Sequence, residues 1–99
     1  MDNGQDDKPG LTGAERSKLR GLAQTLDPKV FVGKAGVNAG IAKLLEEAFR
    51  NADLVKVRFT AEREEMDKQA QELAKLTESE VIGTVGRTAT FFKLGADAE

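Results

Sequence analysis

The chain has 99 residues, with 15 Lys and Arg against 17 Asp and Glu, and its formal net charge is −2. This length corresponds to a single domain. Cys and His are both absent, which excludes disulfides, thiolate chemistry and most zinc or transition-metal sites. No apolar run is long enough to span a membrane and no signal-peptide pattern is visible, so we expect a cytoplasmic protein.

Residues 1–11 are poor in apolar side chains and rich in Asp, Asn and Gly, which predicts a disordered acidic tail. Residues 12–95 are predicted to form one folded domain, followed by a short tail at 96–99. A capping box formed by Thr12 and Glu15 predicts a helix over 13–25. Its apolar positions recur at helical spacing: Leu19, Leu22, Ala23 and Leu26. The Asp27-Pro28 pair ends this helix, because the residue before proline avoids helical geometry.

A short apolar strand over 29–32 follows, and we interpret it as buried, Phe31 included. Asn38 is a natural N-cap for a second helix over 38–52. Its predicted apolar face consists of Ile41, Leu44, Leu45, Ala48 and Ala52. The next strand, 54–59, alternates in type, so Val55, Val57 and Phe59 are predicted to face the core. Lys56 and Arg58 then lie on the opposite face.

Residues 62–77 are predicted to form a third helix, which presents a thin apolar stripe of Met66, Ala70, Leu73, Ala74 and Thr77. Strands are predicted over 81–85 and 88–94, with Gly86 opening a two-residue hairpin turn. The element order is therefore α-β-α-β-α-β-β. It predicts an α/β (α+β) fold with a four-stranded mixed sheet and three helices, because strand–helix–strand units form parallel pairs and hairpins form antiparallel ones.

The segment Gly33-Lys34-Ala35-Gly36 is the strongest functional signal in the chain. Glycines leave the backbone bare, so a ligand can approach it closely. The helix that begins behind this loop offers free N–H donors and the positive end of its dipole, which together favour an anion. Lys34 makes phosphate the leading candidate. A Gly-x-x-Gly loop of this kind clamps the nucleic-acid backbone in KH domains.

An ordered set of motifs resembles the CRM domain family (chloroplast RNA splicing and ribosome maturation), especially its stand-alone bacterial members of the YhbY type. The matching segments are Leu19 to Ala23, Leu26 to Pro28, Val32 to Asn38, Leu54 to Arg58 and Val81 to Gly83. The resemblance implies a fold similar to the C-terminal domain of translation initiation factor three. It also implies RNA binding through the loop, and an association of bacterial members with precursors of the large ribosomal subunit.

On these grounds we predict a non-enzymatic, monomeric RNA-binding protein whose partner is ribosomal RNA. No cofactor, metal, membrane or small-molecule substrate is expected. The candidate RNA-binding residues are Gly33, Lys34, Ala35, Gly36, Asn38, Arg20, Lys18, Lys56 and Arg58. With five Phe and no Tyr or Trp, the chain has few residues for base stacking, which favours recognition of structured RNA by backbone and shape. One of Phe91 and Phe92 is expected in the core, and the other could be exposed, since neighbours in a strand face opposite ways.

Charge is distributed unevenly, and this leaves an alternative open. Residues 14–60 carry nine basic and five acidic residues, a net of +4, whereas residues 61–80 carry three basic and seven acidic, a net of −4. The acidic third helix could instead bind a basic ribosomal protein. The basic side chains of the first helix and the strand 54–59 could also be ordinary solvated faces. A third hypothesis is a small hydrolase or phosphotransferase, but the lack of His and Cys argues against it.

Overall fold

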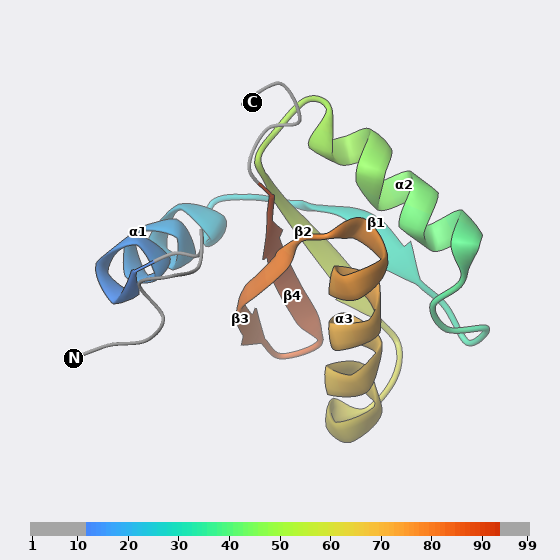
Figure 1. The fold of residues 1–99 in the computed structure, drawn as a ribbon. Coiled ribbons are helices and arrows are strands. Elements are labelled where there is room, and N and C mark those ends of the chain that lie inside the picture. Colours follow the sequence, from blue (N-terminus) through green and yellow to red (C-terminus); the bar gives the residue numbers. More distant parts are fainter. Residues whose placement is uncertain (1–11, 94–99) are drawn as a thin grey trace.

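The computed structural model describes residues 12–93; the predicted tails at 1–11 and 96–99 lie outside this range. Seven elements follow in the predicted order. They are α1 (Gly13–Ala23), β1 (Pro28–Val32), α2 (Ala39–Phe49), β2 (Leu54–Phe59), α3 (Arg63–Thr77), β3 (Glu80–Val85) and β4 (Thr88–Phe92). Helices α2 and α3 lie on one side of the sheet and α1 lies apart from them on the other (Figure 1). The predicted fold class is therefore confirmed.

The four strands form one mixed sheet in the order β1-β2-β4-β3. Strands β1 and β2 are parallel and are joined through α2. Strand β4 is antiparallel to both β2 and β3, so β3 runs in the same direction as β2 without touching it. The β3–β4 turn has Gly86 at a φ of +58°, which is the left-handed geometry that a hairpin turn beginning with glycine requires.

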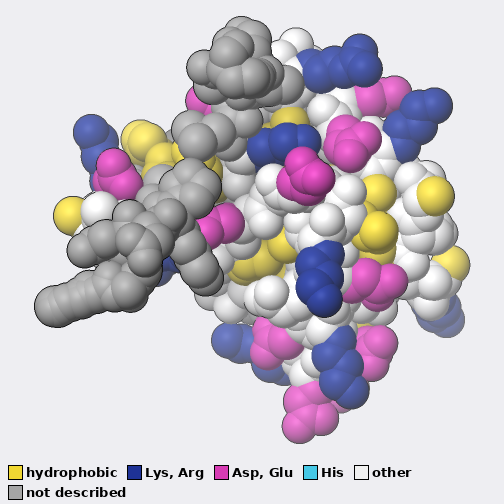
Figure 2. All heavy atoms as spheres, in the orientation of Figure 1, with side chains coloured by type: hydrophobic (Ala, Val, Ile, Leu, Met, Phe, Trp, Pro, Cys, Tyr) yellow, Lys and Arg dark blue, Asp and Glu magenta, His cyan; other side chains and the backbone are white. Residues whose placement is uncertain are grey.

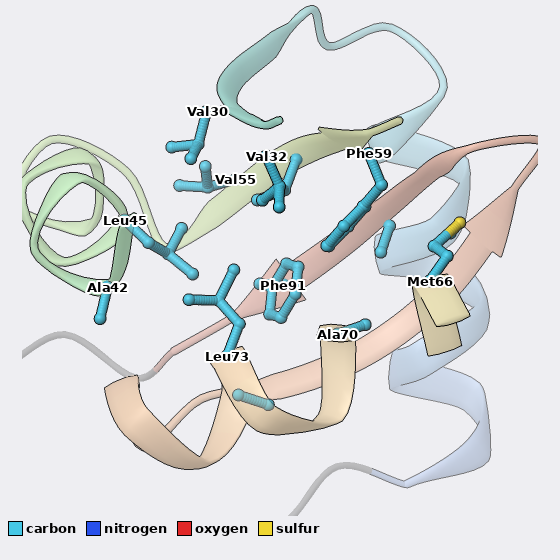
Figure 3. Packing of buried hydrophobic residues seen from close by; sticks show 13 residues of the cluster. Val30, Val32, Ala42, Leu45, Val55, Phe59, Met66, Ala70, Leu73 and Phe91 are labelled. Carbon is cyan, nitrogen blue, oxygen red and sulfur yellow. The ribbon is translucent and has the colours of Figure 1, made fainter. Parts of the chain in front are cut away.

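The core fills the space between the sheet and the pair α2 and α3. Figure 3 shows Leu45 of α2 and Leu73 of α3 pointing toward Phe91 and the valines of β1 and β2. All five residues of the predicted α3 stripe are buried, which confirms the helical period over the full length of that element. In β2 the alternation is also confirmed, because Val55, Val57 and Phe59 are buried while Arg58 is exposed.

Helix α1 is held against β3, the strand at one edge of the sheet. The predicted capping box at Thr12 and Glu15 is present. Arg16 donates to the backbone carbonyl of Val81 (3.4 Å) and pairs with Glu80 at 3.3 Å. Arg20 donates to the carbonyl of Ile82 at 3.2 Å. The stem of Arg20 lies over Gly83, where an added Cβ would come within 2.7 Å of the arginine Cδ.

The burial predicted for Phe31 is wrong, since its side chain is 61% exposed. Its neighbours Val30 and Val32 both face the core. Alternation along the strand therefore turns Phe31 to the opposite face, which α2 and α3 do not cover. A short apolar run predicts burial on both faces, but β1 is an edge strand and only one of its faces is covered here.

Helix bounds and two apolar faces also differ from the predictions. Helix α1 ends at Ala23 in a turn with i→i+3 hydrogen bonds, and α2 ends at Phe49, so Ala52 lies outside the helix. Leu22 and Leu44, each predicted to lie on an apolar face, are about half exposed at 53% and 51%. Both helices therefore bury a narrower stripe than their sequences indicate.

Candidate nucleic-acid interface

The Gly33–Gly36 segment forms a tight turn directly after β1. The N–H of Gly36 donates to the carbonyl of Gly33 at 3.0 Å. Gly33, Lys34 and Ala35 are exposed. Figure 1 shows this β1–α2 connection projecting at the margin of the molecule, with no other element over it.

Helix α2 begins immediately behind the turn. Asn38 caps it as predicted, accepting from the N–H of Ile41 at 2.9 Å. Helix geometry leaves the first N–H groups of α2 without intrahelical acceptors, so they are donors at the positive end of its dipole. Asn38, Ala39 and Gly40 are exposed. The turn and the helix start therefore place backbone donors and the Lys34 ammonium at one accessible corner.

The two glycines of the turn have different structural requirements. Gly36 has a φ of +81°, and an added Cβ would lie 3.3 Å from Nε2 of Gln69 on α3. Gly33 lies outside the left-handed region and has open space around its Cα. The fold itself thus requires glycine at 36 but not at 33. Nothing among the described residues requires glycine at position 33, so the fold does not explain the bare backbone there.

A Gly36→Ala substitution is therefore expected to lower the free energy of unfolding by about 1–2 kcal/mol, because a Cβ is strained at positive φ. The matched variant Gly33→Ala is expected to be neutral or slightly stabilising, by up to about 1 kcal/mol. Urea denaturation followed by circular dichroism measures both. Equal losses in the two variants would contradict the distinction between these glycines.

Thr60, which follows β2, ties three segments together beside the turn. Its N–H donates to the carbonyl of Val32 at 3.2 Å, and its own carbonyl accepts from Nη1 of Arg87 at 3.1 Å. The carbonyl of Arg87 in turn accepts from the N–H of Phe59 at 2.8 Å. These bonds bring the β3–β4 turn to the same end of the sheet as the Gly33–Gly36 turn. Arg58, one residue before Phe59, is exposed at this end.

The predicted site residues consequently fall into two groups. Those that the structure brings to one end of the sheet are Gly33, Lys34, Ala35, Gly36, Asn38 and Arg58. Lys18, Arg20 and Lys56 lie elsewhere. Lys56 is half-buried and donates to the carbonyl of Leu26 at 3.1 Å, so part of its role is structural. Arg20 of α1 contacts β3. Strand β3 is separated from β1 by three strand spacings, or about 14 Å.

Arg87 is a candidate that sequence reasoning missed. It appears in the sequence as a turn residue, and only the pairing of β2 with β4 brings it next to Thr60 and Arg58. Within residues 12–93, neither Arg58 nor Arg87 forms an ion pair. Both guanidinium groups therefore add positive charge to the end of the sheet that carries the Gly-x-x-Gly turn.

The surface of α3 is mixed in charge rather than uniformly acidic. Figure 2 shows acidic and basic side chains interspersed on the face that α3 presents. Arg63 lies 3.9 Å from Asp67 within the helix. Among the described residues, no cluster of three or more acidic side chains is arranged to hold a metal ion. Over the same range, no helix has both the length and the apolar character needed to cross a membrane.

Comparison with known proteins places the chain in a family. Residues 11–93 match the CRS1 / YhbY (CRM) domain. The Probable RNA-binding protein YqeI of Bacillus subtilis is 38% identical over 85 residues, which cover 84% of this chain and 88% of YqeI. The Probable RNA-binding protein MJ0652 of Methanocaldococcus jannaschii is 32% identical over 92 residues, or 90% of this chain and 68% of that protein.

The fold agrees with this assignment. The solution structure of the hypothetical protein SAV1595 from Staphylococcus aureus superposes with a TM-score of 0.80 at 26% identity, covering 91% of this chain and 95% of that one. An α+β fold with an exposed Gly-x-x-Gly turn, matched over nearly its whole length by this family, defines the class of protein. The chain belongs to the CRS1 / YhbY (CRM) domain family.

Proposed function

We propose that this protein binds RNA, without catalysing a reaction, through the end of the sheet that carries the Gly33–Gly36 turn. The observation that carries the proposal is the open backbone at Gly33, Lys34 and Ala35, backed by the start of α2 and flanked by Arg58 and Arg87. Its relatives YqeI and MJ0652, whose names describe RNA-binding proteins, support the same function.

The turn would hold phosphate oxygens with backbone N–H groups, which suits an anion because these donors are fixed before the ligand arrives. Lys34 adds a point charge to the same phosphate group. Arg58 and Arg87 add planar guanidinium groups that can grip a second phosphate with paired hydrogen bonds. Contacts of this kind fix the RNA backbone and do not by themselves choose a base sequence.

The RNA that we propose is ribosomal, in precursors of the large ribosomal subunit, as the family resemblance implies. Binding of the full chain to large-subunit precursor RNA should exceed its binding to small-subunit RNA of equal length. Three cations, Lys34, Arg58 and Arg87, should give a slope of about −2 to −3 for log affinity against log salt between about 50 and 200 mM. Filter binding measures both quantities.

Charge-removal variants make the same experiment specific to this end of the sheet. Arg87→Ala is expected to bring the slope about one unit closer to zero, because one phosphate contact disappears. Lys75 is exposed in the last turn of α3. The Lys75→Ala variant is therefore the matched control and should leave the slope unchanged. A flat salt response of the wild-type protein, or equal effects of the two variants, would refute binding at this site.

A further inference from the structure

Four side chains lie in one straight row across the sheet, on the face opposite the core. Phe31 of β1 is in register with Arg58 of β2, Arg58 with Thr88 of β4, and Thr88 with Val85 of β3. Residues directly opposite one another in neighbouring strands share a face. The row therefore spans all four strands, about 14 Å, and we call it the Phe31 row.

The Phe31 row is open to solvent although α1 lies on the same face. Phe31 is 61% exposed and Val85 is 74% exposed, the two most exposed large apolar side chains in the described part of the chain. The arginines of α1 hold the beginning of β3, at Val81 and Ile82, whereas Val85 is at its other end. Helix α1 is thus anchored away from the row and leaves it uncovered.

The row also borders a shallow hollow and carries only positive charge. The hollow is lined by Arg58, Phe59, Thr60, Val85, Arg87 and Thr88. Two of these residues are arginines and none is acidic. The row continues directly into the candidate phosphate-binding turn, because Phe31 lies in β1 only two residues before Gly33, where the turn begins. A ligand held by its phosphate at the turn would extend its remaining atoms over this face.

We infer that the Phe31 row binds unpaired bases of single-stranded RNA, with a base stacked on the Phe31 ring. This inference rests on the proposed function of the adjacent turn. A base attached to a phosphate at the turn can reach the exposed ring, and the guanidinium plane of Arg58 offers a second stacking surface beside it. A fully paired helix keeps its bases inside the stack, so the occupant is an unpaired segment such as a loop, a bulge or an end.

The test compares a short unstructured RNA oligonucleotide of mixed sequence with the perfect duplex that it forms with its complement. Phe31→Ala is expected to weaken binding of the single strand by about fivefold or more, the usual cost of losing one base stack, and to leave the duplex affinity unchanged. Phe31→Leu keeps apolar bulk without a ring and should lose affinity similarly. Phe31→Trp should retain it.

The Trp variant also reports stacking directly, because the natural chain contains no Trp or Tyr. Its fluorescence should be quenched by the single strand and much less by the duplex. A matched reporter, Leu44→Trp, places an exposed Trp on α2 and should not respond to either RNA. Circular dichroism spectra and melting temperatures of all variants establish that each is folded.

The outcomes separate the row from the proposed function. Wild-type protein that binds neither these RNAs nor large-subunit precursor RNA overturns both, whereas binding of the precursor RNA without binding of the single strand overturns the row alone. Wild-type binding that is unaffected by Phe31→Ala, or weakened equally for single strand and duplex, overturns the role of the row and leaves the turn as the binding element. A protein partner that binds the wild-type chain but not Phe31→Ala, while RNA binding is unchanged, also overturns the inference. The row would then be assigned to that partner.

Discussion

Replacing Gly33 with Asp is expected to weaken RNA binding on the order of 100-fold, close to 3 kcal/mol. The new carboxylate would stand where a phosphate approaches the bare backbone, adding both bulk and like-charge repulsion. The fold should tolerate the change, because Gly33 has open space and does not have a positive φ. Filter binding with large-subunit precursor RNA measures the affinity, and urea denaturation should show a change within about 0.5 kcal/mol.

Gly13 provides the matched control for this substitution. It is exposed at the first position of α1, and an added Cβ would meet no atom within 4 Å. Gly13→Asp changes the net charge by the same amount, and an acidic residue suits the start of a helix. Its RNA affinity should therefore stay close to wild type. Equal losses in Gly13→Asp and Gly33→Asp would mean that net charge, and not the turn, determines binding.

Phe91→Ala is expected to lower the free energy of unfolding by about 3–5 kcal/mol, the usual cost of emptying a fully buried aromatic site. Phe91 is 0% exposed and pairs in register with Val55 and Val81. Figure 3 shows its ring between the sheet and the buried side chain of Leu73. Thermal or urea denaturation followed by circular dichroism measures the loss.

Phe31→Ala is the matched control for stability, because it removes the same side chain from an exposed position in another strand. It should cost less than about 1 kcal/mol, as most exposed substitutions do. A loss comparable to that of Phe91→Ala would show that Phe31 is packed in solution. The Phe31 row would then not be available to a ligand.

Elements with a clear period could be predicted from the sequence alone. The apolar stripe of α3 and the alternation in β2 each follow from a local pattern, and in both cases every predicted core residue is buried. The exposure of Phe31 could not be predicted, because a short apolar run does not show how many faces of its strand are covered. That depends on β1 being at the sheet edge, with α1 anchored on β3 at the opposite edge.

The candidate site was predictable only as far as it is local. The Gly-x-x-Gly turn and the Asn38 cap depend on adjacent residues, so the sequence reveals them. The end of the sheet at which a basic side chain lies depends on residues distant in the chain: Arg20 donates to the carbonyl of Ile82, and strand pairing places Arg87 beside Thr60. Single-sequence reasoning therefore included Arg20 without its structural contact and omitted Arg87.

The arginines of α1 have a consequence for self-association. Strand β3 is an edge strand, and its outward carbonyls could pair with a strand of another molecule. Val81 and Ile82 instead give their carbonyls to Arg16 and Arg20, and the strand has an irregularity in register at the same place. Removing α1 would free these carbonyls, so a chain without the helix is expected to associate more readily through edge-to-edge pairing.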